Sequence, residues 1–352
     1  MSEDDMHLPT RSAPAWKLLR TYRAHPPATV RDNAERRQTF VSALWRMEDL
    51  FHRALTLPPA ARTLPLLYGL CWAGRAIAAS APSLTGADWR LASHGLRSFA
   101  VGPAALPDLV LVTDSPGSAS GFTRVSEILR SPVWGGVRVQ LEDVWDGIPV
   151  NLDHPLSSRD RTTPLYVDGD VGDGHNPLLT VAVCDIPRRV VRARSRQAFE
   201  QHLASFPGTA RCHGYTCRGH GEHAIPAFSS LASGRGGLRM SWLLPQSEAH
   251  TSGRLRLLHS MTHAYGTHRY FLPVAPPLHT PLHPLMAWWA VLCGLATLVH
   301  THGAAWLAYT GPGGSSTAVA HLLRQGPRDL PLLVADALGQ TQSAPARQHI
   351  RS

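Results

Sequence analysis

The sequence predicts an α+β protein: helices from the N- and C-terminal parts form a helical body, and a basic, β-rich segment lies between them. Apolar residues recur at helical spacing near both ends of the chain, whereas most strand-like runs fall in the middle. The middle also carries the net positive charge of the chain. With 352 residues, 43% apolar and 17% charged, the chain is neither a disordered polyelectrolyte nor a long coiled coil.

The N-terminal part, residues 15–155, is expected to be mainly helical and to follow a disordered start over residues 1–14. Pro58 and Pro59 end the second expected helix, and Pro82 ends the third, which has a broad apolar face typical of a buried helix. The elements expected here are helices over 15–23, 31–57, 64–79 and 122–130 and a strand over 108–113.

The middle part, residues 156–280, contains most of the expected strands. Their composition is rich in Val, Leu and aromatic residues, and Gly and Pro clusters separate them. The elements expected here are strands over 178–184, 209–216, 237–244 and 269–274 and a helix over 197–206.

The C-terminal part, residues 281–340, returns to helical patterns before a tail over 341–352 that is expected to be disordered. The apolar run at 285–299 is shorter than the roughly 20 residues that span a bilayer, so we expect a buried core helix and no membrane association. Two more helices are expected, over 317–324 and from Pro331 to Leu338.

The net charge of +9 is confined to one segment. Between residues 188 and 269 there are twelve arginines and three glutamates, so the rest of the chain sums to zero. Such a surface fits an anionic partner, a nucleic acid or a nucleotide. The alternative is a solvated basic face, because no aromatic residues interleave with the densest run. The arginines of that run are Arg188, Arg189, Arg192, Arg194 and Arg196.

A compact run of cysteines and histidines raises the question of a metal. Cys212, Cys217, His220 and His223 follow the spacing Cys-x4-Cys-x2-His-x2-His, and thiolate and imidazole are the ligands that zinc prefers. Zinc here would have a structural role and hold the loop in place, rather than a catalytic role in hydrolysis. The alternative is an exposed hairpin with free thiols and a protein that needs no cofactor.

Arg90 and His94 form the one pair that suggests catalysis on a nucleic acid. In ribonucleases an imidazole can act as general acid or base, and a guanidinium can stabilise the charge that develops on phosphorus. The alternative is that His94 packs at a junction between a helix and a loop.

Three stretches of sequence carry a family resemblance. The first covers residues 15–19 and 47–51. The second is the most specific and contains Leu64-Pro65-Leu66-Leu67-Tyr68-Gly69-Leu70, Gly74-Arg75-Ala76-Ile77 and Ser93-His94-Gly95-Leu96. The third is an apolar helix followed by Trp306 and residues 330–333. Together they resemble the YaaC-like family of bacterial proteins. The resemblance implies a cytoplasmic protein of a family whose activity is mostly uncharacterised.

Two functional hypotheses follow. The first is a non-catalytic binding or regulatory protein that engages an anionic partner through the arginine-rich middle. The second is an enzyme acting on nucleic acid or a nucleotide, ribonuclease-like, through His94 and Arg90. Five cysteines are too few for a disulfide scaffold, and the first twenty residues lack a signal-peptide pattern, so a cytoplasmic location is expected. The apolar helices at both ends also make a homo-oligomer an expectation.

Overall fold

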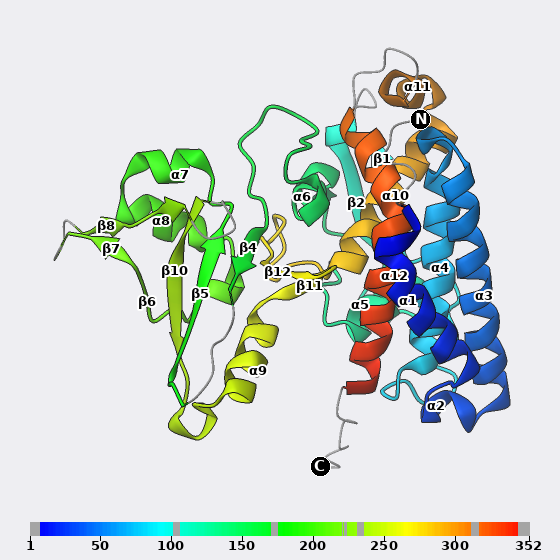
Figure 1. Cartoon of the computed structure of the whole chain (residues 1–352). Helices are drawn as coiled ribbons and strands as arrows, with labels where there is room; N and C mark the ends of the chain where they lie inside the picture. The colour runs from blue at the N-terminus through cyan, green and yellow to red at the C-terminus, as the bar shows by residue number, and fades with distance from the viewer. Residues whose placement is uncertain are drawn as a thin grey trace. The chain divides into compact units, whose positions relative to one another are not determined.

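The computed structural model describes residues 8–100, 106–169, 175–219, 221, 224–230, 236–310 and 317–343 (Figure 1). The chain forms two compact units, unit 1 over residues 1–159 and 275–352 and unit 2 over residues 160–274. The sequence predicted that the middle part begins at residue 156 and ends at residue 280. Helices occupy both ends of the chain and the middle is rich in sheet, so the predicted α+β class is confirmed.

Unit 1 combines helices with one small antiparallel sheet, in which β2 lies between β1 and β3. Its first helix begins at Leu8, so residues 8–14 are helical where disorder was expected, and residues 1–7 lie outside the described residues. The elements of unit 1 are α1 (Leu8–Ala24), α2 (Ala28–Arg31), α3 (Ala34–Thr56), α4 (Thr63–Ser80), β1 (Leu96–Ala100), β2 (Leu109–Thr113), α5 (Gly121–Ile128), β3 (Val139–Gln140), α6 (Leu141–Asp146), α10 (Pro284–Thr301), α11 (Gly303–Thr310) and α12 (Thr317–Ser343).

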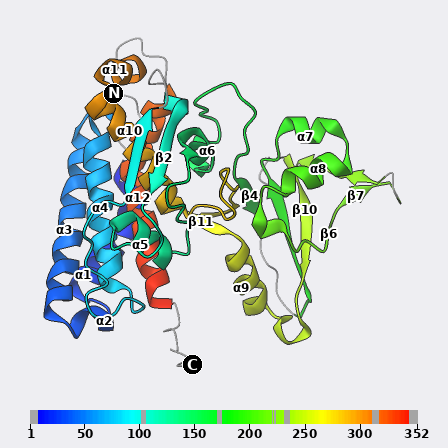
Figure 2. The same cartoon turned by 180° about the vertical axis from the view of Figure 1, so that it is seen from behind.

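Helices α3 and α4 lie side by side, as Figures 1 and 2 both show. The Asn33 side chain caps the start of α3 by accepting the Arg36 backbone N–H at 3.0 Å. A glycine allows close approach: a Cβ on Gly69 of α4 would lie 2.2 Å from the buried ring of Phe51 of α3. The pair therefore packs more tightly than larger side chains would permit.

Helix α10 is the apolar centre of unit 1. By length and composition it could cross a membrane, but 72% of that stretch is buried inside the protein, as in a core helix. Its Trp289 packs against Gly74 of α4, where a Cβ would lie 2.6 Å from the ring. The sequence expectation of a buried helix over 285–299 agrees with this placement.

Helix α12 corrects one expectation. The sequence predicted two helices around Pro331, but α12 is one helix that contains both Pro327 and Pro331. A proline inside a helix removes one backbone hydrogen bond. Packing compensates, because leucines before and after the prolines, among them Leu323 and Leu333, are almost completely buried. The helix continues to Ser343, three residues into the tail expected to be disordered, and residues 344–352 lie outside the described residues.

In its described residues, unit 2 combines an antiparallel sheet with the α-helices α7, α8 and α9. The strand order is β11-β12-β4-β5-β10-β6, with β9 also paired to β10, and β7 and β8 form a separate two-stranded ladder. The elements are β4 (Leu165–Asp168), β5 (Leu178–Cys184), α7 (Arg188–Ala193), α8 (Arg196–Leu203), β6 (Gly214–Tyr215), β7 (Cys217–Arg218), β8 (Ile225–Pro226), β9 (Ser229–Ser230), β10 (Gly236–Leu243), α9 (Thr251–Met261), β11 (His263–Tyr265) and β12 (His268–Phe271).

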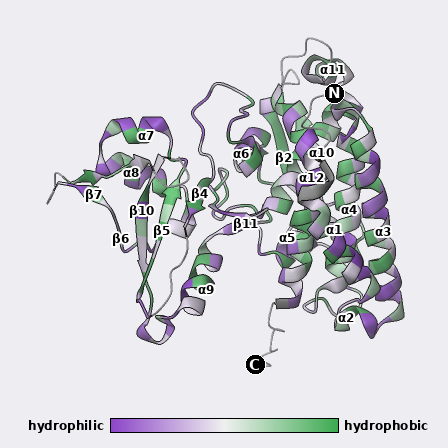
Figure 3. Cartoon of the chain, viewed as in Figure 1, coloured by the Kyte–Doolittle hydropathy of each residue, from purple (hydrophilic) through white to green (hydrophobic). Residues whose placement is uncertain are grey.

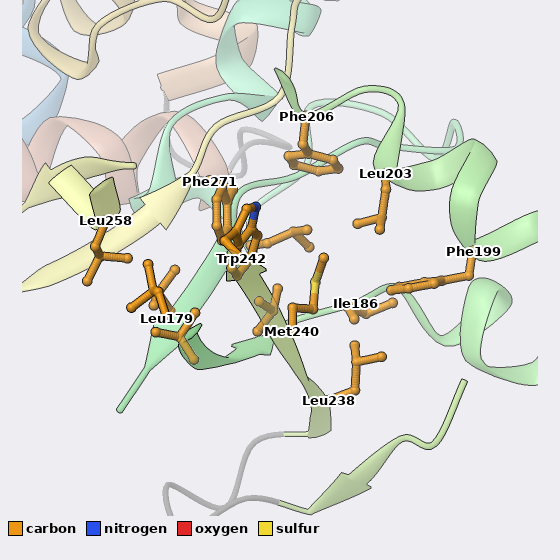
Figure 4. Packing of buried hydrophobic residues seen from close by; sticks show 14 of the residues in the cluster. Leu179, Ile186, Phe199, Leu203, Phe206, Leu238, Met240, Trp242, Leu258 and Phe271 are labelled. Atoms are coloured by element: carbon orange, nitrogen blue, oxygen red, sulfur yellow. The ribbon is translucent and has the colours of Figure 1, made fainter. Parts of the chain in front are cut away.

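The core of unit 2 lies between one face of this sheet and the helices (Figure 4). Alternate residues of β10, Leu238, Met240 and Trp242, are buried, whereas Arg239 between them is exposed, as the two-residue period of a strand requires. Helices α7, α8 and α9 each contribute to the same cluster. The expected strand over 209–216 is wrong in extent: a 3₁₀ turn occupies Pro207–Thr209, and only Gly214–Tyr215 pair with β10.

Candidate functional site

A small pocket in unit 1 lies where α4, the start of α5 and α10 meet. Its volume is about 150 Å³, and Cys71, Arg75, His94, Gly121 and Trp289 are among the residues that line it. Cys71 and Arg75 are four residues apart on α4, so they lie on the same side of the helix one turn apart. The pocket thus gathers a thiol, a guanidinium and an imidazole.

Backbone hydrogen bonds hold the segment that carries His94. The Ser93 carbonyl accepts the Gly121 N–H at 2.8 Å, and the His94 carbonyl accepts the Phe122 N–H at 2.9 Å, so the first N–H groups of α5 are used to position this segment. Gly95 follows with φ +77°, a conformation that favours glycine, and a Cβ there would meet the Ser120 hydroxyl at 2.1 Å. Backbone hydrogen bonds and the conformation of Gly95 therefore fix the position of His94.

The His94 side chain contacts Cys71. The distance between His94 Nδ1 and Cys71 Sγ is 3.3 Å. Burial raises the pKa of the Cys71 thiol to about 12, and the nearby charge of Arg75 opposes this rise. The thiol is therefore protonated at neutral pH and is a weak nucleophile.

The sequence predicted Arg90 as the partner of His94, but Arg90 makes other contacts. Its guanidinium forms an ion pair with the Glu35 carboxylate, with Nε donating to Oε1 at 2.9 Å. It does not line the pocket, whose arginine is Arg75. Neither Cys71 nor Arg75 was predicted as a site residue, although their spacing within the expected helix over 64–79 places them one turn apart.

The five predicted arginines of unit 2 are all exposed and lie on or between α7 and the start of α8; we call them the α7 arginine surface. Val190 of α7 is buried in the core, and α7 alternates hydrophilic and hydrophobic colours in Figure 3. Within the part of the chain that the structure describes, three of the five have no carboxylate partner. These are Arg188, Arg192 and Arg194.

The other two arginines of this surface are paired. Arg189 forms an ion pair with Asp160 at 3.4 Å, and Arg196 forms one with Glu200 at 2.8 Å. Glu200 also accepts the Tyr215 hydroxyl at 3.1 Å, and the hydrogen bond from Arg196 is the main reason that the pKa of Glu200 is lowered. Burial and the hydrogen bond to Glu200 together raise the pKa of Tyr215 to about 12.

A family model described as YaaC-like protein matches residues 8–338. The chain belongs to this family. No curated protein and no solved structure matched it. The match runs from the start of α1 almost to the end of α12, so it covers the pocket and the α7 arginine surface alike. Two parts of the most specific stretch of the YaaC-like resemblance, Gly74-Arg75 and Ser93-His94-Gly95, lie around the pocket of unit 1.

The structure does not test the predicted zinc site of this YaaC-like chain. His220 and His223 lie outside the described residues. The Cys212 thiol donates to the carbonyl of Gly214 at 3.2 Å, and Cys217 is exposed. Among the described residues, no three His, Cys, Asp or Glu side chains are grouped to hold a metal ion.

Proposed function

We propose that this YaaC-like protein is a non-catalytic binding protein that engages a nucleic acid through the α7 arginine surface. The proposal rests on one observation: Arg188, Arg192 and Arg194 are exposed within seven consecutive residues and lack carboxylate partners among the described residues. A guanidinium is always charged and matches the geometry of a phosphate. When arginines neutralise the phosphates of a nucleic acid, the cations condensed on its backbone are released, and this release supplies affinity.

The paired arginines of this surface support the same function. The side chains of Arg189 and Arg196 are 44% and 57% exposed, and exposed ion pairs contribute little to stability. A phosphate can therefore replace Asp160 or Glu200 as the partner at small cost. Since no aromatic residue falls within the run over 188–196, contacts to the phosphate backbone dominate, and little sequence preference is expected.

The binding test uses a fluorescently labelled RNA oligonucleotide of mixed sequence and the intact protein, with anisotropy measured over a series of salt concentrations. Affinity should fall steeply with salt. The variant R188E/R192E/R194E should bind more weakly, and the slope of log affinity against log salt should become shallower by roughly 2, as expected for three lost phosphate contacts on a single strand.

A matched control separates this surface from general charge effects. Arg31, Arg37 and Arg46 are exposed arginines of unit 1, and R31E/R37E/R46E changes the net charge by the same amount. This control should retain most of the affinity. If both variants lose affinity equally, or if the unmodified protein does not bind at low salt, the proposal is wrong.

The alternative, a ribonuclease-like enzyme that uses Arg90 with His94, has less support. Arg90 is engaged by Glu35, and the pocket beside His94 contains Arg75 instead.

A further inference from the structure

The pocket of unit 1 is lined by a positively charged side chain, as a site that binds an anion requires. Among the described residues that line it, Arg75 and His94 are the only ionisable side chains besides the Cys71 thiol, and none is an aspartate or glutamate. Arg75 is half-buried, and its guanidinium lies 5.0 Å from the ring centre of Trp72 without a carboxylate partner in the described ranges. A cation held against an aromatic ring keeps its N–H groups for a ligand.

The contact between Cys71 and His94 defines a second donor. Because the thiol is protonated, its S–H can donate to Nδ1 of a neutral imidazole. The remaining proton of that imidazole then sits on Nε2, which can donate to a ligand oxygen. His94 is exposed, so a ligand from solvent can reach it.

The walls limit the size of the ligand. The pocket holds about 150 Å³, roughly five times the volume of one water molecule in the liquid. Trp289 forms one wall and is held against Gly74, so the wall cannot retreat without disturbing the packing of α4 on α10. This room suits one tetrahedral or planar oxyanion group rather than a large molecule.

We propose that this pocket binds the oxyanion group of a small molecule, a phosphate or a carboxylate, with Arg75 as its ion partner and His94 as a second donor. The inference concerns unit 1 and is independent of the nucleic-acid proposal for unit 2. Charge-assisted hydrogen bonds from arginine are the strongest polar contacts that such a ligand can make, so Arg75 should dominate the affinity.

The test is isothermal titration calorimetry on the full chain with inorganic phosphate and, separately, with acetate, at constant ionic strength. Binding of either probe is expected, and the one that binds tells which oxyanion the pocket prefers. R75Q should weaken binding roughly tenfold to a hundredfold, as loss of a charged hydrogen-bond donor does. R75K, which keeps the charge, should lose less. R90Q and R31Q, which each remove an exposed cation outside the pocket, should leave binding unchanged.

Alkylation by iodoacetamide, followed peptide by peptide, locates the bound anion. Phosphate or acetate should slow alkylation of Cys71 and leave exposed Cys217 of unit 2 unaffected. The proposal is overturned if neither probe binds the unmodified protein, if R75Q and R75K bind as well as the unmodified protein, or if R90Q abolishes binding instead. If R75Q does not fold, the proposal is tested by R75K, which should bind more weakly, and by the slower alkylation of Cys71 in the presence of the anion.

Discussion

The buried or paired arginines of unit 1 and the exposed arginines on α7 of unit 2 play different roles. In unit 1, Arg36 is only 8% exposed, and its guanidinium donates to three backbone carbonyls at and beyond the end of α4. Arg20 and Arg23 of α1 both bind Glu48 of α3. In unit 2, by contrast, three arginines of the α7 arginine surface face solvent without a carboxylate partner among the described residues.

This difference shows that net charge alone does not locate a binding surface. The segment over 188–269 carries the whole charge of +9, yet one of its arginines, Arg254, is 1% exposed and donates to the carbonyl of Asn176. Arg269 likewise donates to Thr262. Arginines of this kind hold the fold, so only the solvent-exposed arginines count toward recognition.

The largest expected effect is on the buried arginine of unit 1. Arg36→Met removes the donors of three carbonyls in a buried environment, and we expect the free energy of unfolding to fall by roughly 3–5 kcal/mol. Urea denaturation followed by circular dichroism measures this. Arg37 is the next residue on the same helix and is exposed, so Arg37→Met should change stability by less than about 0.5 kcal/mol. Equal losses at the two positions would remove the distinction between structural and surface arginines.

A smaller, pH-dependent effect is expected at Glu48. Burial raises the pKa of this carboxyl, but the hydrogen bonds and charges of Arg20 and Arg23 outweigh burial and leave the pKa below its ordinary value of 4.5. Its stabilising contribution is thus complete above pH 4.5 and is lost as the pH falls through the lowered pKa. Glu48→Gln should cost about 1 kcal/mol at neutral pH, because both arginines keep some contact with water.

The measurement is urea denaturation of both proteins at neutral and at strongly acidic pH, where the difference between them should vanish. Glu200→Gln is the comparison in unit 2, because Glu200 pairs with an exposed arginine, Arg196. It should change stability less than Glu48→Gln. A difference at Glu48 that persists with Glu48 protonated would show that packing, not charge, is responsible.

The smallest effect on stability is expected at the α7 arginine surface. R188Q/R192Q/R194Q should change the free energy of unfolding by less than about 0.5 kcal/mol, because these side chains are solvated and unpartnered. Urea denaturation measures this, and RNA affinity measured on the same samples should nevertheless fall. If the variant instead loses stability, weaker RNA binding would reflect a damaged unit 2 rather than lost phosphate contacts.

Sequence patterns were most informative where one physical rule dominates. The strand over 178–184 agrees with β5 residue for residue, because its alternate side chains enter the core. The buried helices around residues 64–79 and 285–299 were also anticipated. The two helices expected around Pro331 were wrong, since burial along α12 outweighs the local effect of Pro327 and Pro331.

The pocket could be anticipated only in part. His94 was chosen for its chemistry and does line the pocket, but the choice of Arg90 assumed that closeness in sequence means closeness in space. The contact of His94 with Cys71 spans 23 residues and depends on hydrogen bonds from the start of α5, which no local pattern reveals. The α7 arginines could be predicted as a charged run, but which of them are paired depends on tertiary contacts with Asp160 and within α8.

The division of the chain has a consequence for synthesis on the ribosome. Helix α1 packs on α12, and α4 packs on α10 and α12, so the core of unit 1 needs helices that are translated last. Unit 2 is continuous over residues 160–274 and draws its core from that stretch alone. During translation, therefore, the first 159 residues emerge without the partners that cover their apolar faces, and unit 2 is the first part able to complete its core. Until α12 leaves the exit tunnel, the apolar side of α4 is open to chaperones and to other nascent chains.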